Sequence, residues 1–395
     1  MAEVVRESTT VVVVGAGPSG LTLANLLRGA GIGCVIVEAR SRTYVEQRQR
    51  AGVLDYHATQ IFERAGLTER VIQNAKNDPL LEVRIDGEPH FIDILALAGG
   101  RGNRILPQQI LVQRLIAALL EDGGDLRTEA AGVDLHDIDG DRPRVTYTDA
   151  DGVPHEIECD YIAGCDGFHG VSRKRIPEDA LETFAFDHGI GWFTVLAETP
   201  PPVHPTMGVS RYGFAAQFPR GPKASRFYLQ CLPDDDLQKW PDERIWDQLR
   251  VRLGDANLPS GPISEKAVVE MRSFVVDPMS YGRLFLVGDA AHVITPMGGK
   301  GMNLALADAD ILATAIRAAV REGDQKPLGE YSATCVQRTW RYQEFSRWMT
   351  EMLHDSGDDS VSGPFRRKLA RARLERLFTS AAVGTTWAEM MAGVG

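Results

Sequence analysis

A glycine-rich turn near the N-terminus constrains the fold more than any other feature of this chain. The β-branched run from Val11 to Val14 leads into GAGPSG. The next segment, LTLANLLRGAG, has the apolar spacing of a helix and precedes a second apolar run, CVIVEAR. This order predicts a strand, a turn, a helix and a strand at a parallel sheet. In such a unit the N-terminus of the helix faces the phosphates of a bound dinucleotide.

The glycines of this turn have separate physical roles. Gly15 permits a tight turn, Gly17 lets the backbone approach a pyrophosphate, and Gly20 allows the helix to pack closely against the strand. Glu38 closes the second strand, where a carboxylate can bind a ribose hydroxyl. An incidental glycine-rich turn is the alternative. The strand before the turn, the helix after it and the acid beyond it favour a dinucleotide site.

The composition is that of an acidic globular protein. The chain has 395 residues, of which 44% are hydrophobic and 25% charged, which is enough for two or three modules that share cores. Its formal net charge of −11 disfavours a broad attraction to nucleic acid or to an anionic membrane, so local arginines must hold any anionic ligand. We therefore expect neither nucleic acid nor a membrane as a partner.

The cysteines and the N-terminus predict a cytoplasmic protein. Five scattered cysteines without a CxxC pair indicate neither a disulfide framework nor a zinc site, and no other metal site is expected. The N-terminus, MAEVVRESTT, lacks the basic start and long apolar core of a signal peptide. No uncharged apolar run approaches the roughly 18 residues of a membrane span.

The hydrophobic pattern changes twice along the chain, which predicts an interrupted first domain. Alternating hydrophobicity typical of antiparallel strands occurs from about 80 to 97 and from about 183 to 232, among helical and buried-strand patterns. We predict an α/β fold in which a Rossmann-like domain is interrupted by a mostly antiparallel β-sheet substrate domain and followed by a helical region. The predicted bounds are 1–79, 99–182 and 272–352 for the first domain, 80–98 and 183–271 for the second, and 353–395 for the C-terminal helices.

Two later motifs place an aspartate at the end of an apolar strand, beside glycines. Asp166 lies in YIAGCDGFHGVSR, and Asp289 lies in RLFLVGDAAH, which is followed by VITPMGGKGMNLALADA. Taken singly, each aspartate would be a helix N-cap more often than a ligand. Asp289 precedes a glycine-rich turn and a helix, which suits a second ribose or phosphate contact at a helix N-terminus.

The collinear order of GAGPSG, CDGFHG and GDAAH with P-x-G-x-K-G-x-N resembles the class A flavoprotein aromatic hydroxylases, in particular those that act on 4-hydroxybenzoate. The likeness runs from about Val11 to Met352. It implies non-covalent FAD, O₂, a small aromatic carboxylate as substrate, and a homodimer. It also implies a reduced nicotinamide, either NADPH or NADH, and hydroxylation through a flavin hydroperoxide. Arg40, Arg42 and Arg48 could hold a 2′-phosphate, which favours NADPH.

The resemblance implies cofactor contacts residue by residue. The backbone from Pro296 to Asn303 would lie beside the isoalloxazine ring. The positions that match FAD contacts are Gly15, Gly17, Pro18, Ser19, Gly20, Glu38, Arg50, Gln109, Asp166, Asp289, Gly301, Met302 and Asn303. The positions that match nicotinamide contacts are Tyr44, Arg48, His169, Arg173 and Arg272. Surface salt bridging is the alternative for those arginines.

The implied substrate residues come from the second predicted sheet. The carboxylate-binding arginine and tyrosine of the family match Arg220 and Tyr228, and a guanidinium supported by a phenol hydroxyl is a suitable clamp for a benzoate. Trp192 is expected to be a wall of the pocket. Pro296 and Met297 lie on the flavin side and are the candidate catalytic positions.

This chain departs from the family where hydroxyl groups would draw a proton from the 4-hydroxyl of the substrate. Those positions match Met207, Met391 and Asp78, with Phe218 beside the clamp and Met297 after the flavin-side proline. Thioethers cannot act as acids or bases, so this pocket is less able to generate a phenolate. We therefore predict an aminobenzoate or amino-hydroxybenzoate as substrate, because an amino group activates the ring without deprotonation.

Other functions stay open. The enzyme could hydroxylate 4-hydroxybenzoate itself, or it could oxidise NAD(P)H and reduce O₂ without hydroxylating anything. A flavin-dependent halogenase would be expected to carry a Trp-x-Trp-x-Ile-Pro motif, which this sequence lacks. A non-catalytic dinucleotide-binding regulator would show no affinity for FAD.

Overall fold

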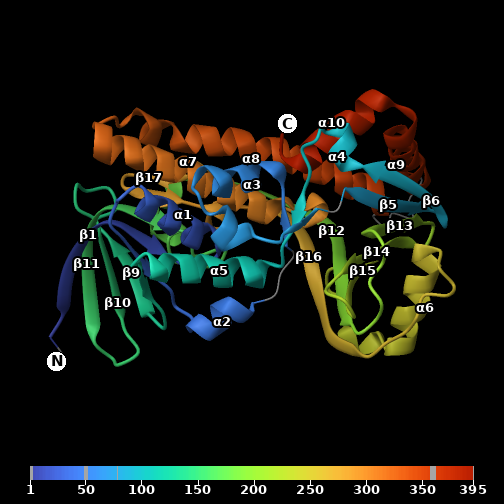
Figure 1. Ribbon diagram of the computed structural model, residues 1–395, viewed down its shortest axis with the longest axis horizontal. Helices are drawn as coiled ribbons and strands as arrows, with labels where there is room; N and C mark the ends of the chain where they lie inside the picture. Colours follow the sequence, from blue (N-terminus) through green and yellow to red (C-terminus); the bar gives the residue numbers. More distant parts are fainter. Residues whose placement is uncertain (1–2, 49–51, 78, 356–361, 395) are drawn as a thin grey trace.

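The computed structural model describes residues 3–48, 52–77, 79–355 and 362–394. Two residues singled out above, Arg50 and Asp78, lie outside these ranges. Figure 1 shows two β-sheets side by side along the long axis of the molecule, with the long helices α7 and α8 running along its upper side.

The first sheet has the parallel centre that the glycine-rich motif predicts, and β9, β10 and β17 join it in antiparallel pairs. β1 pairs in parallel with β11 and β2, and these strands pair in parallel with β18 and β8. Val11 to Val14 of β1 are at most 3% exposed, as expected for a strand covered on both faces. The strands are β1 (Val5–Val14), β2 (Cys34–Val37), β8 (Asp125–Arg127), β9 (Ala131–His136), β10 (Arg144–Thr148), β11 (Pro154–Gly164), β17 (Ser280–Tyr281) and β18 (Leu284–Leu286).

Helices cover this sheet. α1 contacts both α5 and α7, and α7 packs in turn against α8 (Figure 1). None of the helices that the structure describes is both long and apolar enough to span a membrane. The elements of this region are α1 (Pro18–Gly29), α2 (Arg42–Gln47), α3 (Tyr56–Arg64), η1 (Thr68–Ile72), α5 (Gln108–Glu121), η2 (Arg173–Arg175), η3 (Glu178–Ala180), α7 (Lys300–Glu322), α8 (Lys326–Leu353) and a small sheet of β3 (Val53–Leu54), β4 (Lys76–Asn77) and β7 (Arg104–Ile105).

The second sheet is antiparallel apart from one pair of strands. Its order is β19-β16-β12-β15-β14-β13-β5-β6, in which β13 and β5 run parallel. The long strands β12 and β16 extend from this sheet towards the parallel one (Figure 1), and β16 pairs with β19 inside the GDAAHV segment. The strands are β5 (Leu80–Ile85), β6 (Glu88–Asp93), β12 (Glu182–Ala197), β13 (Thr206–Ser210), β14 (Gly213–Pro219), β15 (Ser225–Cys231), β16 (Ile263–Asp277) and β19 (His292–Val293).

The two faces of the second sheet have different covers. α6 (Asp242–Leu253), which follows η4 (Leu237–Lys239), packs against β13 and β14. On the opposite side, α9 (Ser362–Thr379) and α10 (Ala381–Ala392) share a buried cluster with β5 and β6 (Figure 1). The face that carries the predicted substrate residues Trp192 and Met207 therefore lies under the C-terminal helices.

One predicted strand ends earlier than expected. The alternating pattern predicts strand from about 80 to 97, but β6 ends at Asp93 and the short helix α4 (Ile94–Leu97) follows. The Asp93 carboxylate accepts a hydrogen bond from Ala96 N at 2.8 Å, so it caps the helix and ends the strand. The α/β fold class, with an antiparallel second sheet and C-terminal helices, is confirmed.

Candidate active site

The GAGPSG turn has the geometry that its glycines require. Gly15 has φ +105°, and a Cβ there would lie 2.5 Å from the carbonyl oxygen of Cys165. A Cβ at Gly20 would lie 2.1 Å from the carbonyl oxygen of Gly15, so turn and helix are in close contact. A Cβ at Gly17, by contrast, would meet no atom within 4 Å. This open space, at a helix N-terminus without a side-chain cap, is where a pyrophosphate fits.

The carboxylate of Glu38 is fixed beside this turn. Its oxygens accept hydrogen bonds from Ala16 N at 2.8 Å and from Arg40 N at 2.7 Å. Gly15 N donates to Val37 O at 2.8 Å, which joins the turn to β2. Glu38 is thus held at the carboxyl end of β2, where a ribose hydroxyl would bind.

The GDAAH motif approaches the same turn from β18, through the short helix η5 (Gly288–Ala290). A Cβ at Gly288 would lie 3.5 Å from Ser19 Oγ, so the segment with Asp289 lies against the start of α1. The buried Asp308 of α7 accepts hydrogen bonds from Gly288 N at 3.0 Å and from His292 Nε2 at 2.7 Å. Burial disfavours a charged imidazole, but the Asp308 carboxylate outweighs that effect and raises the pKa of His292. His292 and Asp308 therefore hold the motif in place.

Two buried oxygens at predicted FAD positions have no hydrogen-bond partner among the residues that the structure describes. Asp166 Oδ2 accepts from Ser172 N at 2.8 Å and from its hydroxyl at 3.0 Å, but Asp166 Oδ1 is unsatisfied. Gln109 Oε1, at the start of α5, is also unsatisfied. Such acceptors are rare in native proteins. They fit a ligand that donates hydrogen bonds here, as the hydroxyls of FAD would.

The loop from Pro296 to Gly299 opens α7. Gly298 and Gly299 have φ +73° and +63°, the left-handed region that favours glycine, and they form η6 (Met297–Gly299) with the buried Met297. α7 begins with no side-chain cap, so the N–H groups of its first turn are directed out of the helix. A helix N-terminus stabilises negative charge, which suits a reduced, anionic flavin. This first turn contains Lys300, Gly301 and Met302.

A buried ion pair holds this loop to its surroundings. Lys300 Nζ donates to Asp55 Oδ2 at 3.1 Å and to the carbonyl of Met391 at 2.7 Å, and both charged side chains are at most 2% exposed. Burial lowers the pKa of Lys300, although Asp55 opposes the shift. The Asn303 amide accepts from Asp55 N at 3.0 Å and donates to backbone carbonyls of β3 and of the loop at 2.9 and 2.8 Å. Lys300 and Asn303 therefore join α7, β3 and α10.

Strand register places the predicted substrate residues on one face of the second sheet. Residues directly opposite one another across β13, β14, β15 and β12 are Met207, Ala216, Tyr228 and Thr194. Because side chains alternate along a strand, Phe218 and Trp192, each two residues along, share this face. The opposite face packs against α6 through Phe193, Ala215, Phe227 and Leu229.

Trp192 is the centre of an aromatic group on this face. Its ring centroid lies 4.6 Å from that of Tyr228 and 5.6 Å from that of Phe214. The indole Nε1 donates to His354 Nε2 at 2.7 Å, and His354 Nδ1 lies 3.1 Å from Thr350 O. A carbonyl can only accept, so Nδ1 carries the proton and Nε2 the lone pair. Burial lowers the pKa of His354 to about 3, which keeps this neutral tautomer.

The predicted carboxylate clamp lies at the β14–β15 hairpin. Arg220 N donates to Ala224 O at 2.8 Å and closes the turn. Burial lowers the pKa of the Arg220 guanidinium and raises the pKa of the Tyr228 phenol, and the two side chains interact electrostatically. A partly desolvated guanidinium attracts a carboxylate more strongly than an exposed one does. Arg226, two residues before Tyr228 on the same strand, forms an ion pair with Glu265 at 3.3 Å.

Buried methionines pack beside this clamp. Met207, Met297 and Met391 are 6%, 1% and 7% exposed and belong to one buried cluster with Trp192, against which Tyr228 packs. A Cβ at Gly298 would lie 3.4 Å from the sulfur of Met391. Met207 lies on the sheet and Met297 in the loop before α7. We call Met207, Met297 and Met391 the methionine cluster.

The predicted nicotinamide contacts fall into two groups. In the first, the guanidinium carbons of Arg173 and Arg272 lie 4.8 and 4.2 Å from the ring centroid of Phe168, which also contacts the exposed His169. Arg173 donates to the backbone of the GDAAH motif at 2.7 Å and to Phe168 O at 2.6 Å, so it bridges two cofactor motifs. The second group is exposed, on α2 or directly after it, and consists of Tyr44 and Arg48.

Sequence reasoning missed three buried polar residues of the site: Asp55, Lys300 and His354. A lysine within a glycine-rich motif was a signal for Lys300. No local pattern marks Asp55 or His354. The partner of Asp55 is Lys300, 245 residues away in the chain, and the partner of His354 is Trp192, 162 residues away.

Comparison with known proteins agrees with this geometry. Residues 8–346 match the family described as "FAD binding domain". The chain is 37% identical over 390 residues to a p-hydroxybenzoate hydroxylase of Acinetobacter baylyi, covering 98% of this chain and 95% of that protein. It is 28% identical to a 3-(3-hydroxy-phenyl)propionate/3-hydroxycinnamic acid hydroxylase of Mycobacterium avium, covering 96% of this chain but 65% of that protein.

A solved structure has the same fold. The p-nitrophenol 4-monooxygenase of Pseudomonas putida superposes with a TM-score of 0.81 over 99% of both chains, at 20% identity. The family match and the full-length relative, together with a turn that fits a pyrophosphate, determine the class of protein. The chain belongs to the FAD binding domain family and is an FAD-dependent aromatic hydroxylase with NAD(P)H and O₂ as co-substrates.

Proposed function

We propose that the enzyme hydroxylates a benzoate that is activated by an amino group, such as an aminobenzoate or an amino-hydroxybenzoate. One observation carries this proposal: Met207, Met297 and Met391 share one buried cluster beside Tyr228. Phe218 borders the same cluster, and its ring lies 5.7 Å from that of Tyr228. A hydroxylase of phenols needs a group that takes the phenolic proton, and thioethers cannot take it.

An amino substituent removes that requirement. FAD, when bound, supplies with NAD(P)H and O₂ an electrophilic oxygen atom for the aromatic ring. The ring must therefore be rich in electrons, and an amino nitrogen donates its lone pair without losing a proton. In this proposal Arg220 and Tyr228 hold the carboxylate, while the methionines and Trp192 exclude water from around the ring.

The nearest titratable groups do not replace the missing base. Burial raises the pKa of Tyr228, so its phenol keeps its proton at neutral pH and can donate a hydrogen bond to the carboxylate. Both ring nitrogens of His354 are already engaged, one by Trp192 and one by Thr350. These features support a pocket that binds a neutral substituent on the ring.

Hydroxylation of 4-hydroxybenzoate is the second candidate. It is favoured by the relative from Acinetobacter baylyi, which is named for this activity and is 37% identical over nearly the whole chain. Under this alternative another group must take the phenolic proton. Oxidation of NAD(P)H without hydroxylation is the third candidate, and it would leave every benzoate unmodified.

The ionisation of a bound ligand separates the first two candidates. 4-Hydroxybenzoate is titrated into the FAD-loaded enzyme between pH 6 and 8, and the difference spectrum is read for phenol or phenolate. We expect the bound ligand to stay a phenol. Phenolate in the complex, at a pH where the free ligand is a phenol, would contradict the proposal and favour 4-hydroxybenzoate as the substrate.

The clamp is tested in the same titration with 4-aminobenzoate. Arg220→Gln should weaken its binding about tenfold, because a charge-assisted hydrogen bond is lost. Arg211→Gln removes an exposed arginine from the turn between β13 and β14 and is the charge-matched control. Equal affinities in the two variants would argue against Arg220 as the carboxylate ligand.

A further inference from the structure

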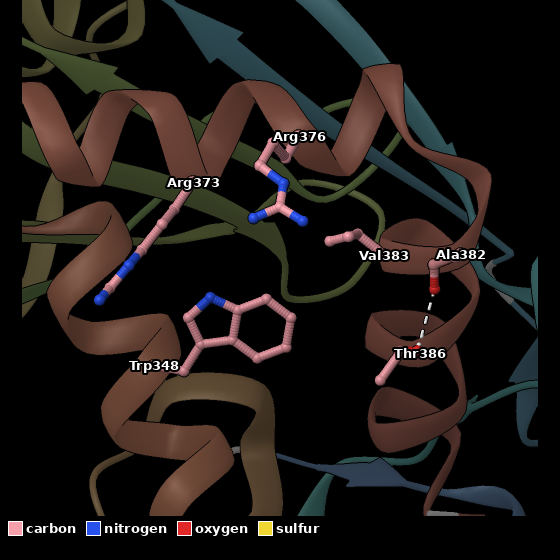
Figure 2. A pocket seen from close by; sticks show the side chains of 6 residues that line it. All are labelled: Trp348, Arg373, Arg376, Ala382, Val383 and Thr386. Atoms are coloured by element: carbon pink, nitrogen blue, oxygen red, sulfur yellow. Dashed lines mark hydrogen bonds between the residues drawn. The ribbon is translucent and has the colours of Figure 1, made fainter.

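The C-terminal helices enclose a surface cavity apart from the site described above. It has a volume of about 350 Å³ and is lined by Trp348 of α8, Arg373 and Arg376 of α9, and Ala382, Val383 and Thr386 of α10. In Figure 2 the guanidinium of Arg376 is directed into the space above the indole of Trp348, and Arg373 lies along one side. The volume is within the range of sites for small molecules.

The two guanidiniums differ in their partners. Arg373 Nη1 lies 3.3 Å from Glu351 Oε2, and Glu351 is shared with Arg347 at 2.8 Å. Within the part of the chain that the structure describes, the Arg376 guanidinium has neither a hydrogen bond nor an ion pair. Its donors are therefore available to a carboxylate, which a guanidinium can bind through two parallel hydrogen bonds.

The surroundings of the cavity favour an anion although the protein is acidic overall. The formal net charge of the chain is −11. α9 nevertheless carries one acid, Glu375, against the basic residues Arg366, Arg367, Lys368, Arg371, Arg373 and Arg376. Arg367, Arg371 and Arg373 pair with acids, so Arg376 is the base of the cavity lining whose charge is left to attract an anion among the described residues.

The rest of the lining suits an aromatic ring. Trp348 presents its indole, and Val383 and Ala382 add apolar surface across the cavity (Figure 2). The Thr386 hydroxyl donates to Ala382 O at 2.9 Å within α10, so its proton is not available to a ligand (Figure 2). A cationic end and an aromatic floor together select an aromatic acid.

The cavity is connected to the active site through one layer of side chains. The ring of Trp348 meets that of Phe345 edge to face at 6.0 Å. Phe345 in turn borders the loop that opens α7, because a Cβ at Gly298 would lie 3.2 Å from its ring. Trp348 and Phe345 therefore separate the cavity from the loop that contains Met297.

We propose that this cavity is a second binding site for a small aromatic carboxylate. The carboxylate is held by Arg376 with help from Arg373, and the ring stacks on Trp348. This site is independent of which benzoate the enzyme hydroxylates. It holds the ligand without transforming it, at a distance of one side-chain layer from the catalytic loop.

Equilibrium dialysis of the full-length, FAD-loaded enzyme against benzoate tests this proposal. At a benzoate concentration that just fills both wild-type sites, we expect two benzoates per chain in the wild type and about one in each of Arg376→Gln and Arg220→Gln, because the altered site loses its charge-assisted hydrogen bonds. Lys368→Gln, which removes an exposed charge from the same helix outside the cavity, should still bind two. Trp348→Phe should keep the second site, and Trp348→Leu should weaken it.

Three outcomes are distinguishable. Unchanged binding of both benzoates in Arg376→Gln would overturn the second site. One benzoate in the wild type and none in Arg220→Gln would overturn it too, including the case in which a second copy of the chain covers the cavity. One benzoate in both the wild type and Arg220→Gln, lost in Arg376→Gln, would support the second site and count against the proposed clamp instead.

Discussion

The indole Nε1 of Trp192 donates a 2.7 Å hydrogen bond to Nε2 of His354, which ties one face of the second sheet to the end of α8. His354 cannot turn freely, because its Nδ1 is bonded to Thr350 O at 3.1 Å. Trp192 stacks on Phe214 with an interplanar angle of 9° and contacts Tyr228. His354 is therefore a positioning residue for the wall beside the predicted clamp.

Removing the acceptor of this hydrogen bond should disturb substrate binding. His354→Leu leaves a buried indole N–H without a partner and should lower the free energy of unfolding by about 1–3 kcal/mol. We expect the KM for the aromatic substrate to rise several-fold with a smaller change in kcat. His354→Gln can accept from Trp192 and donate to Thr350, so it should restore most of the lost affinity. Steady-state kinetics that give the same KM for wild type and His354→Leu would rule out this positioning role.

His354 should also make stability depend on pH. Its pKa falls from 6.5 to about 3 on folding, because burial removes water from the ring and disfavours its charged form. Between these values the unfolded chain binds a proton that the native protein does not, so the contribution of His354 is complete above pH 6.5 and is lost as the pH falls. From pH 6.5 to about pH 5 the loss is about 2 kcal/mol. Urea denaturation should show a correspondingly smaller loss in His354→Gln, and parallel losses in both proteins would contradict the shift.

The buried pair of Lys300 and Asp55 should be energetically coupled. Lys300→Met leaves the Asp55 carboxylate buried without its cation, which should cost about 3–5 kcal/mol of unfolding free energy. Asp55→Asn alone should also destabilise, whereas the double variant should lose less than the sum of the two single losses. A double-mutant cycle by chemical denaturation measures this coupling. Strict additivity would mean that the ion pair contributes no interaction of its own.

Gly17 should be needed for FAD rather than for folding. A Cβ at Gly17 meets open space, so Gly17→Ala should fold, but the methyl group would occupy the space that a pyrophosphate needs. We expect FAD affinity to fall roughly tenfold or more, a loss of about 1.4 kcal/mol or more. Gly29→Ala is the matched control, because it adds the same methyl group to open space elsewhere on α1. Equal FAD affinity in both variants, measured by fluorescence titration of the apoprotein, would contradict the assignment.

Local patterns predicted most of the fold. The valine run and GAGPSG predicted β1, the turn and α1, and alternating hydrophobicity predicted an antiparallel second sheet. The pairing of strands was harder to predict from the sequence. The parallel contact between β5 and β13 joins segments that are far apart in the chain, so no local pattern marks it. The early end of β6 depends on the Asp93 carboxylate, which caps α4.

The sequence could propose site residues only where the chemistry depends on a contiguous motif. The sequence could not decide whether Asp166 is a cap or a ligand. In the structure its Oδ2 accepts from Ser172 N as a cap does, while its Oδ1 has no partner among the described residues. Arg173 was proposed as a nicotinamide contact, but its guanidinium also donates to two backbone carbonyls, a role that requires the folded loop. All assignments to FAD, nicotinamide and substrate positions, including those of Asp166 and Arg173, stay predictions.

The most direct test of the proposed function is the ratio of hydroxylated product to NADPH consumed, measured by mass spectrometry and absorbance with the FAD-loaded enzyme. The panel comprises 4-aminobenzoate, amino-hydroxybenzoates and 4-hydroxybenzoate. The methionine cluster of Met207, Met297 and Met391 beside Tyr228 leads us to expect a ratio near one for an amino-substituted benzoate and a ratio far below one for 4-hydroxybenzoate. A ratio near one for 4-hydroxybenzoate, with the amino compounds left unmodified, would contradict it.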